Sequence, residues 1–304
     1  MSLSLHRYGF TALGSPCEVQ VYSESRIAAK KLCQELALEV LRLDRKYSRY
    51  RTDSVLSEIN FSAGSKLGIK IDAETKSLFD HAKFCYEQSE GLYDITSGIL
   101  RRIWNAKTAK IPQQKAIDAL LPRIGFDRLE WNRSRLLLPH GMEIDFGDMI
   151  KELAVDAVAK RGRKLGIQHG LVNLGGDFAV IGPQPGNQPW QVGVVNPDDH
   201  NALLVKIPLS SGALASCGDY ERKFEHDGKH FNNMLNPRTG WPCAGLRAAS
   251  VAADKCLQAG AIASIALLRN EADGILLLEE STLPYVYMTG EGKVAGPAAE
   301  AAVA

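Results

Sequence analysis

Four short glycine-containing segments hold most of the side chains in this chain that could do chemistry. They combine a glycine with carboxylate, hydroxyl, thiol or aromatic groups, and they span residues 92–98, 145–148, 173–177 and 216–220. A glycine at such a junction can adopt a positive φ or let the backbone approach a ligand closely. One such junction is usually structural, whereas four in one chain favour a shared ligand cleft. The chain has no Gly-x-Gly-x-x-Gly, Walker or Gly-x-Ser-x-Gly motif, so ordinary nucleotide cradles and serine hydrolase chemistry are disfavoured.

Lys151 adds a positive charge close to the second of these segments. It lies in the first turn of a helix that we expect over residues 149–165, where a positive charge opposes the helix dipole. A bound phosphate or the nearby carboxylate of Asp148 would offset this charge, and both alternatives stay open. Asp145 and Asp148 together indicate a divalent-metal site with the oxygen ligands that Mg²⁺ prefers. A simple N-cap role for Asp148 is the structural alternative.

Polar side chains are also concentrated in the last third of the chain. The run Asn-Pro-Arg-Thr-Gly at residues 236–240 has more hydrogen-bonding groups than a turn requires, so it either holds an anion or pins a loop. Cys217 has no candidate base beside it in the sequence, which favours a packed thiol over a nucleophile. His226 and His230 flank an expected turn at residues 227–228, which favours an exposed hairpin over a metal site.

Hydrophobic periodicity predicts the elements that position these segments. Many antiparallel-looking strands without a regular βαβ alternation indicate the α+β class. Residues 1–294 are expected to form a single domain, and residues 295–304, which are mostly small, a tail that frays. We expect helices over residues 28–43, 72–86, 117–124, 149–165 and 256–268, and strands within 7–22 and at 70–71, 136–138, 143–146, 170–174, 179–181, 191–195, 203–207, 213–216, 248–252 and 285–288.

Composition limits the function classes. The chain has 304 residues and a formal net charge of +1, which gives no electrostatic reason to expect nucleic acid or an anionic membrane as a partner. No segment reaches the roughly 18 apolar residues of a membrane span. The six cysteines form no Cys-x-x-Cys pair, which indicates reduced thiols. Because the first residues also lack the pattern of a secretory signal, we expect a cytoplasmic protein without a membrane anchor.

The order of these segments resembles that of the ApbE-type FAD:protein FMN transferase family, of which the chain looks like a diverged member. Residues 12–15 resemble the family's Ala-Met-Gly-Thr turn, and residues 93–100 resemble its Asp-x-Thr-x-Gly-Pro-Leu segment. The run Asp-Phe-Gly-Asp-Met-Ile-Lys-Glu-Leu-Ala-Val-Asp from Asp145 is similar to its Asp-Leu-Gly-Gly-Ile-Ala-Lys-Gly-Tyr-Ala-Val-Asp. Three further segments complete the match, at residues 172–177, 216–222 and 237–240.

The resemblance implies a fold of mixed sheets with flanking helices and a ligand cleft between two sub-sheets. It also implies an activity, the Mg²⁺-dependent transfer of FMN from FAD to a threonine of an acceptor flavoprotein with release of AMP. Such a reaction needs a cation and a positioned hydroxyl acceptor. Tyr50 or Tyr93 would stack on an aromatic ring of FAD. By resemblance, the FAD site would contain Leu13, Tyr50, Leu92, Tyr93, Asp94, Asp145, Lys151 and Met234.

Several departures from the family pattern fall in the expected metal site and beside it. The family's run Ala-Asp-Ala-Leu-Ala-Thr-Ala, which holds its metal carboxylate and a threonine, has Gly260 and Ser264 at those two places here. Asn233 stands where the family has a histidine, and Asp148 where it has the second glycine of its Gly-Gly pair. We therefore expect a metal group of Asp148, Gly260 and Ser264, in which Asp148 replaces the missing carboxylate. Asn233 and Asp148 are the expected catalytic residues.

The same departures leave two other functions open. A degenerate relative would bind FAD without transferring FMN. An FAD pyrophosphatase would use water in place of the acceptor hydroxyl and release FMN and AMP. The expected ligands are FAD and Mg²⁺, and the expected partner of the transferase is an acceptor flavoprotein.

Overall fold

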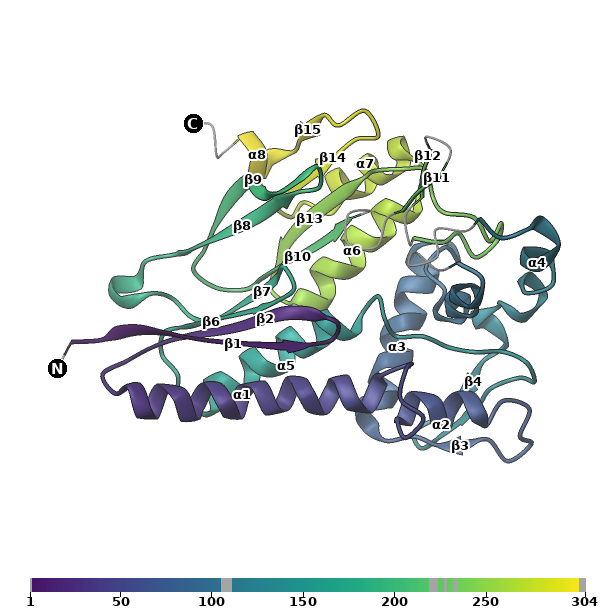
Figure 1. The fold of residues 1–304 in the computed structure, drawn as a ribbon, viewed down its shortest axis with the longest axis horizontal. Helices are drawn as coiled ribbons and strands as arrows, with labels where there is room; N and C mark the ends of the chain where they lie inside the picture. Colours follow the sequence, from purple (N-terminus) through teal and green to yellow (C-terminus); the bar gives the residue numbers. More distant parts are fainter. Residues whose placement is uncertain (1, 105–110, 219–223, 227–228, 232–233, 301–304) are drawn as a thin grey trace.

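An eight-stranded antiparallel sheet forms the centre of the molecule (Figure 1). The computed structural model describes residues 2–104, 111–218, 224–226, 229–231 and 234–300. In β2, side chains alternate between the core and the other face, with Cys17, Val19 and Val21 buried. The strands follow the order β1 (Ser4–Ala12), β2 (Ser15–Ser23), β6 (Gly170–Leu174), β7 (Asp177–Gly182), β10 (Ala213–Gly218), β13 (Ala248–Ala253), β14 (Tyr285–Met288) and β15 (Val294–Ala295).

Three long helices cover one face of this sheet (Figure 1). They are α1 (Arg26–Tyr47), α5 (Ile150–Lys164) and α6 (Cys256–Leu268). The Ser25 hydroxyl accepts a hydrogen bond from the Ala28 amide and so caps α1. The carboxylate of Asp156 on α5 accepts from the amides of Cys256 and Leu257, so one helix supplies the cap of its neighbour. This contact fixes the start of α6 against the middle of α5.

The other face of the sheet is covered by the hairpin of β8 (Trp190–Asn196) and β9 (Asp199–Leu209) (Figure 1). Phe178 and Val180 of the large sheet pack with Trp190 and Ile207 of the hairpin in one buried cluster. The α+β class is therefore confirmed. The predicted site residues meet on the helical side of the large sheet, and not between this sheet and the hairpin, where the cleft between sub-sheets was expected.

The described residues of the range 49–149 form a region beside the large sheet that contains helices and three short strands (Figure 1). The strand expected at residues 143–146 is wrong. The Ile144 amide donates to the Asn60 side chain at 2.8 Å, and the Asp145 amide donates to the Ile95 carbonyl at 2.9 Å, so neither is available for a ladder. The region contains α2 (Val55–Phe61), β3 (Ile69–Lys70), α3 (Ala73–Gln88), the 3₁₀ helices η1 (Ile95–Arg102), η2 (Leu121–Arg123) and η3 (Phe126–Arg128), α4 (Gln114–Asp118), β4 (Glu130–Trp131) and β5 (Arg135–Leu137).

The C-terminal part contains more structure than the sequence predicted. A helix, α7 (Glu271–Glu280), follows α6, and a short helix, α8 (Pro297–Glu300), lies in the segment that we expected to fray. Two short strands, β11 (Phe224–His226) and β12 (Lys229–Phe231), pair as the expected hairpin, whose turn lies outside the described residues.

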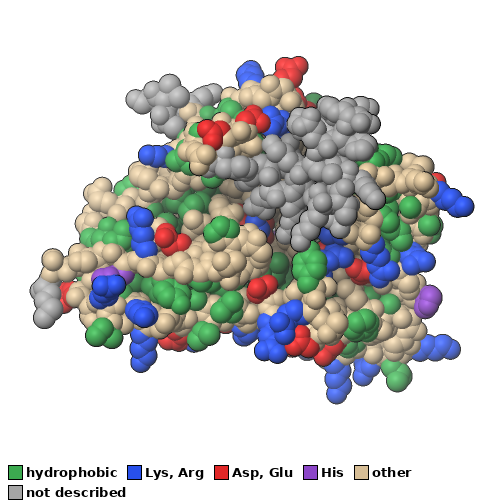
Figure 2. Space-filling view, viewed as in Figure 1, with side chains coloured by type: hydrophobic (Ala, Val, Ile, Leu, Met, Phe, Trp, Pro, Cys, Tyr) green, Lys and Arg blue, Asp and Glu red, His purple; other side chains and the backbone are tan. Residues whose placement is uncertain are grey.

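None of the helices in the described residues is long and apolar enough to cross a membrane. Acidic and basic side chains are interspersed on the face shown in Figure 2. This mixture agrees with the formal net charge of +1.

Candidate functional site

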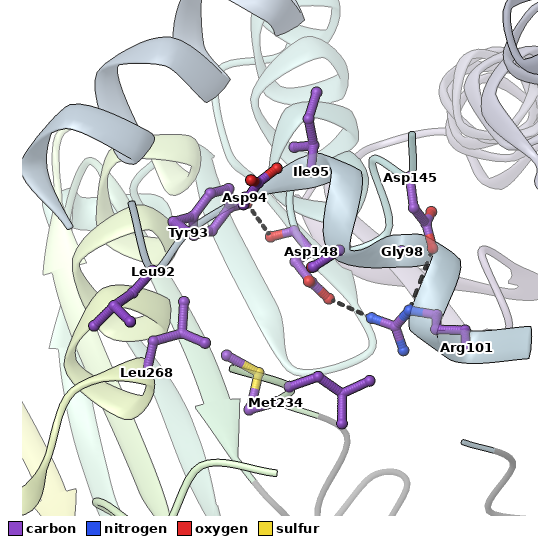
Figure 3. A pocket seen from close by; sticks show the side chains of 12 residues that line it. Leu92, Tyr93, Asp94, Ile95, Gly98, Arg101, Asp145, Asp148, Met234 and Leu268 are labelled. Carbon is purple, nitrogen blue, oxygen red and sulfur yellow. Dashed lines mark hydrogen bonds and ion pairs between the residues drawn. The ribbon is translucent and has the colours of Figure 1, made fainter. Parts of the chain in front are cut away.

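A pocket lies where the loop after α3, η1, the turn before α5 and the C-terminal end of α6 meet (Figure 3). Its cavity volume is about 30 Å³, and about 480 Å³ of space is empty when the open solvent at its mouth is included. Six of the residues expected in the site contribute to its wall, namely Leu92, Tyr93, Asp94, Asp145, Asp148 and Met234. Ile95, Ser97, Gly98, Arg101, Leu235 and Leu268 complete the wall. The junctions at residues 92–98 and 145–148 thus share one pocket.

Tyr93 and Tyr50, the two expected stacking residues, have very different surroundings. The Tyr93 side chain is buried, and its hydroxyl donates to the backbone carbonyl of Asp148 at 3.2 Å. Burial raises the pKa of this hydroxyl well above its ordinary value. Tyr50 is 83% exposed and lies with Arg49 and Arg102 along a separate surface hollow. Only Tyr93 therefore lines the pocket.

Asp94 holds the pocket wall in shape. Its carboxylate accepts from the Thr96 amide at 2.7 Å, from the Thr96 hydroxyl at 2.6 Å and from the Phe126 amide at 3.1 Å. These bonds cap η1 and attach it to η3. Burial raises the pKa of this carboxyl, although the hydrogen bonds act in the opposite direction. Asp94 lines the pocket, but its carboxylate oxygens already accept hydrogen bonds from Thr96 and Phe126.

Arginines and carboxylates alternate at the mouth of the pocket, in a group that we call the mouth network. Arg101 contacts Asp145 at 3.3 Å and Asp148 at 3.0 Å (Figure 3). Burial alone would lower the pKa of Arg101, but these carboxylates raise it above its ordinary value. Gly98 is required here, because a Cβ at this position would lie 2.4 Å from the Asp145 Cβ. The members of the network are Arg49, Arg101, Arg102, Glu143, Asp145 and Asp148.

The start of α5 excludes one of the two alternatives for Asp148. The N-cap position is Met149, whose side chain makes no capping bond, so Asp148 is not the N-cap of the helix. The Asp148 carboxylate pairs with Arg101 instead. Lys151 lies in the first turn as expected, with its ammonium 3.8 Å from the Asp177 carboxylate.

A second group of polar side chains, which we call the inner cluster, lies where α5, α6, β7 and β10 meet. Its members are Lys151, Glu152, Asp177, Cys217, Gly260 and Ser264. The junction at Gly175 packs against its edge, because a Cβ there would meet Ser15 at 2.7 Å and Lys151 at 3.8 Å. Leu13, with a φ of 54°, lies in the neighbouring turn between β1 and β2. Leu13, Lys151, Gly260 and Ser264 thus lie in or beside this cluster and not in the pocket wall.

Glu152 is the member of the inner cluster that sequence reasoning missed. Its side chain is buried, and one carboxylate oxygen, Oε2, has no hydrogen-bond partner among the described residues. Burial and the neighbouring Asp177 carboxylate raise its pKa well above the ordinary value. The available signal was its place in the motif, where the quoted family run has glycine after lysine. Asp148, the expected replacement for the carboxylate absent at Gly260, lies instead in the mouth network.

Cys217 connects the inner cluster to α6. Its sulfur lies 3.2 Å from the Ser264 hydroxyl and 3.9 Å from the Gly260 carbonyl. Burial raises the pKa of this thiol well above its ordinary value, and Glu152 adds to the shift. A protonated, packed thiol agrees with the interpretation favoured from the sequence.

The corner at residues 236–240 is held by internal contacts. The Asn236 side chain accepts from the amides of Arg238 and Thr239, and the Arg238 guanidinium donates to the Glu90 carbonyl. These bonds favour the loop-pinning alternative over an anion site. Asn233, the expected catalytic residue, lies outside the described residues, so its role stays a prediction.

No metal cluster of the usual kind is evident in the part of the chain that the structure describes. Three or more His, Cys, Asp or Glu side chains do not gather there in a way that could hold an ion. Gly260 provides no side-chain oxygen, and Ser264 provides a hydroxyl whose neighbour is Cys217. The expected metal group of Asp148, Gly260 and Ser264 therefore stays a prediction.

Comparison with known proteins identifies the family. The model of the ApbE family matches residues 13–287. A Haemophilus influenzae protein named FAD:protein FMN transferase is 27% identical over 243 residues, which cover 76% of this chain and 70% of that protein. A Vibrio cholerae protein of the same name is 25% identical over 281 residues, which cover 90% and 84%. The crystal structure of the ApbE protein from Thermotoga maritima matches with a TM-score of 0.88 at 25% identity, covering 96% of this chain and 97% of that one. The chain therefore belongs to the ApbE family.

Proposed function

We propose that this protein transfers FMN from FAD to a threonine hydroxyl of an acceptor flavoprotein, with release of AMP and dependence on Mg²⁺. Relatives that carry the name FAD:protein FMN transferase support the proposal. The observation that carries it is the meeting of the pocket and the inner cluster on α5. Asp148 lines the pocket directly before this helix, and Lys151 and Glu152 lie in its first turn.

The proposed reaction is a substitution at phosphorus. The acceptor hydroxyl oxygen bonds to the phosphorus of the FMN half, the bond from that phosphorus to the bridging oxygen breaks, and AMP leaves with the bridging oxygen. The hydroxyl proton passes to solvent. A bound Mg²⁺ would neutralise charge on the diphosphate. The protein itself offers two cations, Lys151 at the N-terminus of α5 and Arg101 in the pocket wall.

Product analysis tests the proposal. Purified protein is incubated with FAD and Mg²⁺, with and without a threonine-bearing acceptor, and the products are separated by mass spectrometry and chromatography. Covalent FMN on the acceptor together with AMP is the expected result. Free FMN and AMP without acceptor would indicate the pyrophosphatase, and bound FAD with neither product would indicate the silent relative. Either of these two results overturns the transferase proposal.

A pair of adjacent arginines tests the pocket separately. We expect Arg101→Met to weaken FAD binding by about tenfold, the effect of losing one charge-assisted contact to an anion. Arg102→Met is the matched control, because Arg102 pairs with Glu143 and does not line the pocket. Equal FAD dissociation constants for the two variants, measured by fluorescence quenching, would place the flavin outside this pocket.

Asn233→Ala tests the proposed catalytic role of Asn233. A cytoplasmic location of the protein and its acceptor stays a prediction.

A further inference from the structure

The inner cluster contains a buried carboxylate, Glu152, whose charge is disfavoured by burial and favoured by the nearby Lys151 ammonium. Glu152 is 5% exposed, and its Oε2 is buried without a hydrogen-bond partner in the described part of the chain. Asp177, a second carboxylate, is close enough to raise the pKa of Glu152. A buried carboxylate is unfavourable unless it is protonated, paired or bound to a metal. Among the described residues, Oε2 of Glu152 is therefore left for a proton or a bound cation.

The neighbour of this carboxylate is Gly260 on α6. A Cβ at residue 260 would lie 2.6 Å from Cγ and 2.7 Å from Oε1 of Glu152, and the three nearest atoms all belong to Glu152. The Glu152 side chain thus occupies the space that a side chain at residue 260 would need. In the family runs quoted above, the residue at the place of Glu152 is glycine and the residue at the place of Gly260 is aspartate. Both positions have been exchanged, and the space between the two helices still holds one carboxylate.

The other groups beside Gly260 suit a hard divalent cation. Ser264 lies one turn further along α6, and its hydroxyl is 3.2 Å from the Cys217 sulfur, which also lies 3.9 Å from the Gly260 carbonyl. Hydroxyl, carbonyl and carboxylate oxygens are the ligands that Mg²⁺ prefers. Mg²⁺ commonly uses only one or two carboxylates and takes its remaining ligands from water and substrate phosphates. The lack of a group of three acidic, His or Cys side chains in the described residues therefore does not disagree with such a site.

We propose that Glu152 replaces, from α5, the carboxylate that α6 lacks at residue 260, and that it binds the divalent cation of this protein. The inference deepens the proposed function and rests on it for the role of the cation. It does not rest on it for the binding itself, which is measured without FAD. Asp148, the other candidate for the same replacement, has Arg101 as its partner and is not among the atoms nearest to Gly260.

The test compares the metal affinity of four forms of the full chain. Mn²⁺ binding is followed by electron paramagnetic resonance and Mg²⁺ binding by calorimetry, both without FAD. We expect Glu152→Gln, which keeps the size of the side chain, to weaken binding by about tenfold or more. Asp148→Ala tests the rival replacement by Asp148, and it should change the affinity by less than about twofold because the Asp148 carboxylate pairs with Arg101. The double variant Glu152→Gly/Gly260→Asp, which moves the carboxylate back to α6, should bind within a few-fold of wild type.

Two results overturn the inference: no Mn²⁺ binding by the wild type, or equal binding by wild type and Glu152→Gln. Thermal unfolding without metal shows whether each variant is folded, and the double variant keeps the test valid if Glu152→Gln is unstable. The outcome is separate from that of the proposed function. If metal binding depends on Glu152 but the protein transfers no FMN, the proposed function is wrong and the proposed metal site is supported. If the protein transfers FMN but its metal affinity does not depend on Glu152, the proposed metal site is wrong and the proposed function is supported.

Discussion

Two groups of carboxylates lie near the start of α5, and their charges are balanced in different ways. In the mouth network, Asp145 faces Arg49 and Arg101, and Asp148 faces Arg101. In the inner cluster, Glu152 and Asp177 are both buried, and the nearby ammonium of Lys151 is 3.8 Å from Asp177. The first group is balanced by the protein's own arginines. In the second, Oε2 of Glu152 has no hydrogen-bond partner among the described residues, so it is left for a proton or a cation.

The difference between the two groups predicts how each should respond when a buried charge is removed. A buried ion pair that is complete contributes little net stability, but removing one partner is strongly unfavourable because the other charge is left in a poor solvent. A buried charge without its partner is already unfavourable in the folded state, so neutralising it should have the opposite effect. The two groups should therefore respond to the same kind of substitution with opposite signs.

The largest effect is expected for Asp145→Ala in the mouth network. The Asp145 side chain is only 9% exposed and is shared by two arginines, so its removal should lower the free energy of unfolding by about 3–5 kcal/mol. Urea denaturation measures the change. Asp148→Asn is the matched control, because this side chain is 46% exposed and should cost about 1 kcal/mol or less. Similar losses for the two variants would mean that burial does not set the strength of this network.

The inner cluster should show the opposite sign. In the presence of EDTA, Glu152→Gln removes an unbalanced buried charge while keeping the volume of the side chain. We expect the free energy of unfolding to rise by about 2 kcal/mol at a pH where the wild-type group is ionised. The same denaturation experiment measures it. A loss of stability comparable to that of Asp145→Ala would show that Glu152 is already compensated within the protein.

A smaller loss is expected at Asp94, which combines burial with internal hydrogen bonds. Asp94→Ala leaves the amides of Thr96 and Phe126 without their acceptor, which should cost about 1–2 kcal/mol. The pH dependence has a defined sign. Burial raises the pKa of Asp94 in the folded state, so the folded protein holds this proton more tightly than the unfolded chain does.

The stabilisation from that proton is fully present below the unfolded pKa and is lost as the pH rises through the folded pKa. Relative to Asp94→Asn, which cannot titrate, the wild type should therefore become more stable as the solution is acidified. Denaturation of both proteins across the acidic range measures this difference. A wild type that loses stability relative to the variant on acidification would mean that the hydrogen bonds outweigh burial.

The parts of this structure that the sequence predicted are those set by local pattern. The helix α6 was expected over the same residues that the structure has, because a long apolar run needs no distant partner to be recognised. The pocket wall at Tyr93, Asp94 and Asp145 was expected from its polar glycine junctions. One local signal was overlooked: Asn270 caps α7 by accepting from the Asp273 amide, as an asparagine before an acidic first turn suggests.

The parts that were missed depend on contacts between distant residues. Residues 143–146 have a strand-like composition, but the amides of Ile144 and Asp145 donate hydrogen bonds to the Asn60 side chain and the Ile95 carbonyl instead of to a neighbouring strand. The contact between Glu152 and Gly260 joins two helices that are far apart in the sequence. Only the structure shows that the Glu152 side chain occupies the space beside Gly260. Asp148 was chosen for the same role because it carries a carboxylate where the family run has a glycine, and the sequence did not indicate that Arg101 would be its partner.

The smallest effect is expected for an ion pair that belongs to neither group. Lys83 and Glu87 are one turn apart on α3, and their side chains are 53% and 55% exposed, so water solvates both charges with or without the pair. A double-mutant cycle with Lys83→Ala and Glu87→Ala should give a coupling free energy of about 0.3–0.5 kcal/mol that decreases as salt is added. A coupling as large as the loss in Asp145→Ala would contradict the view that burial makes the difference between the charged groups of this protein. A coupling free energy near zero would support this view more strongly. Solvation would then cancel the attraction between Lys83 and Glu87 at the surface, whereas ion pairs between buried side chains affect stability strongly.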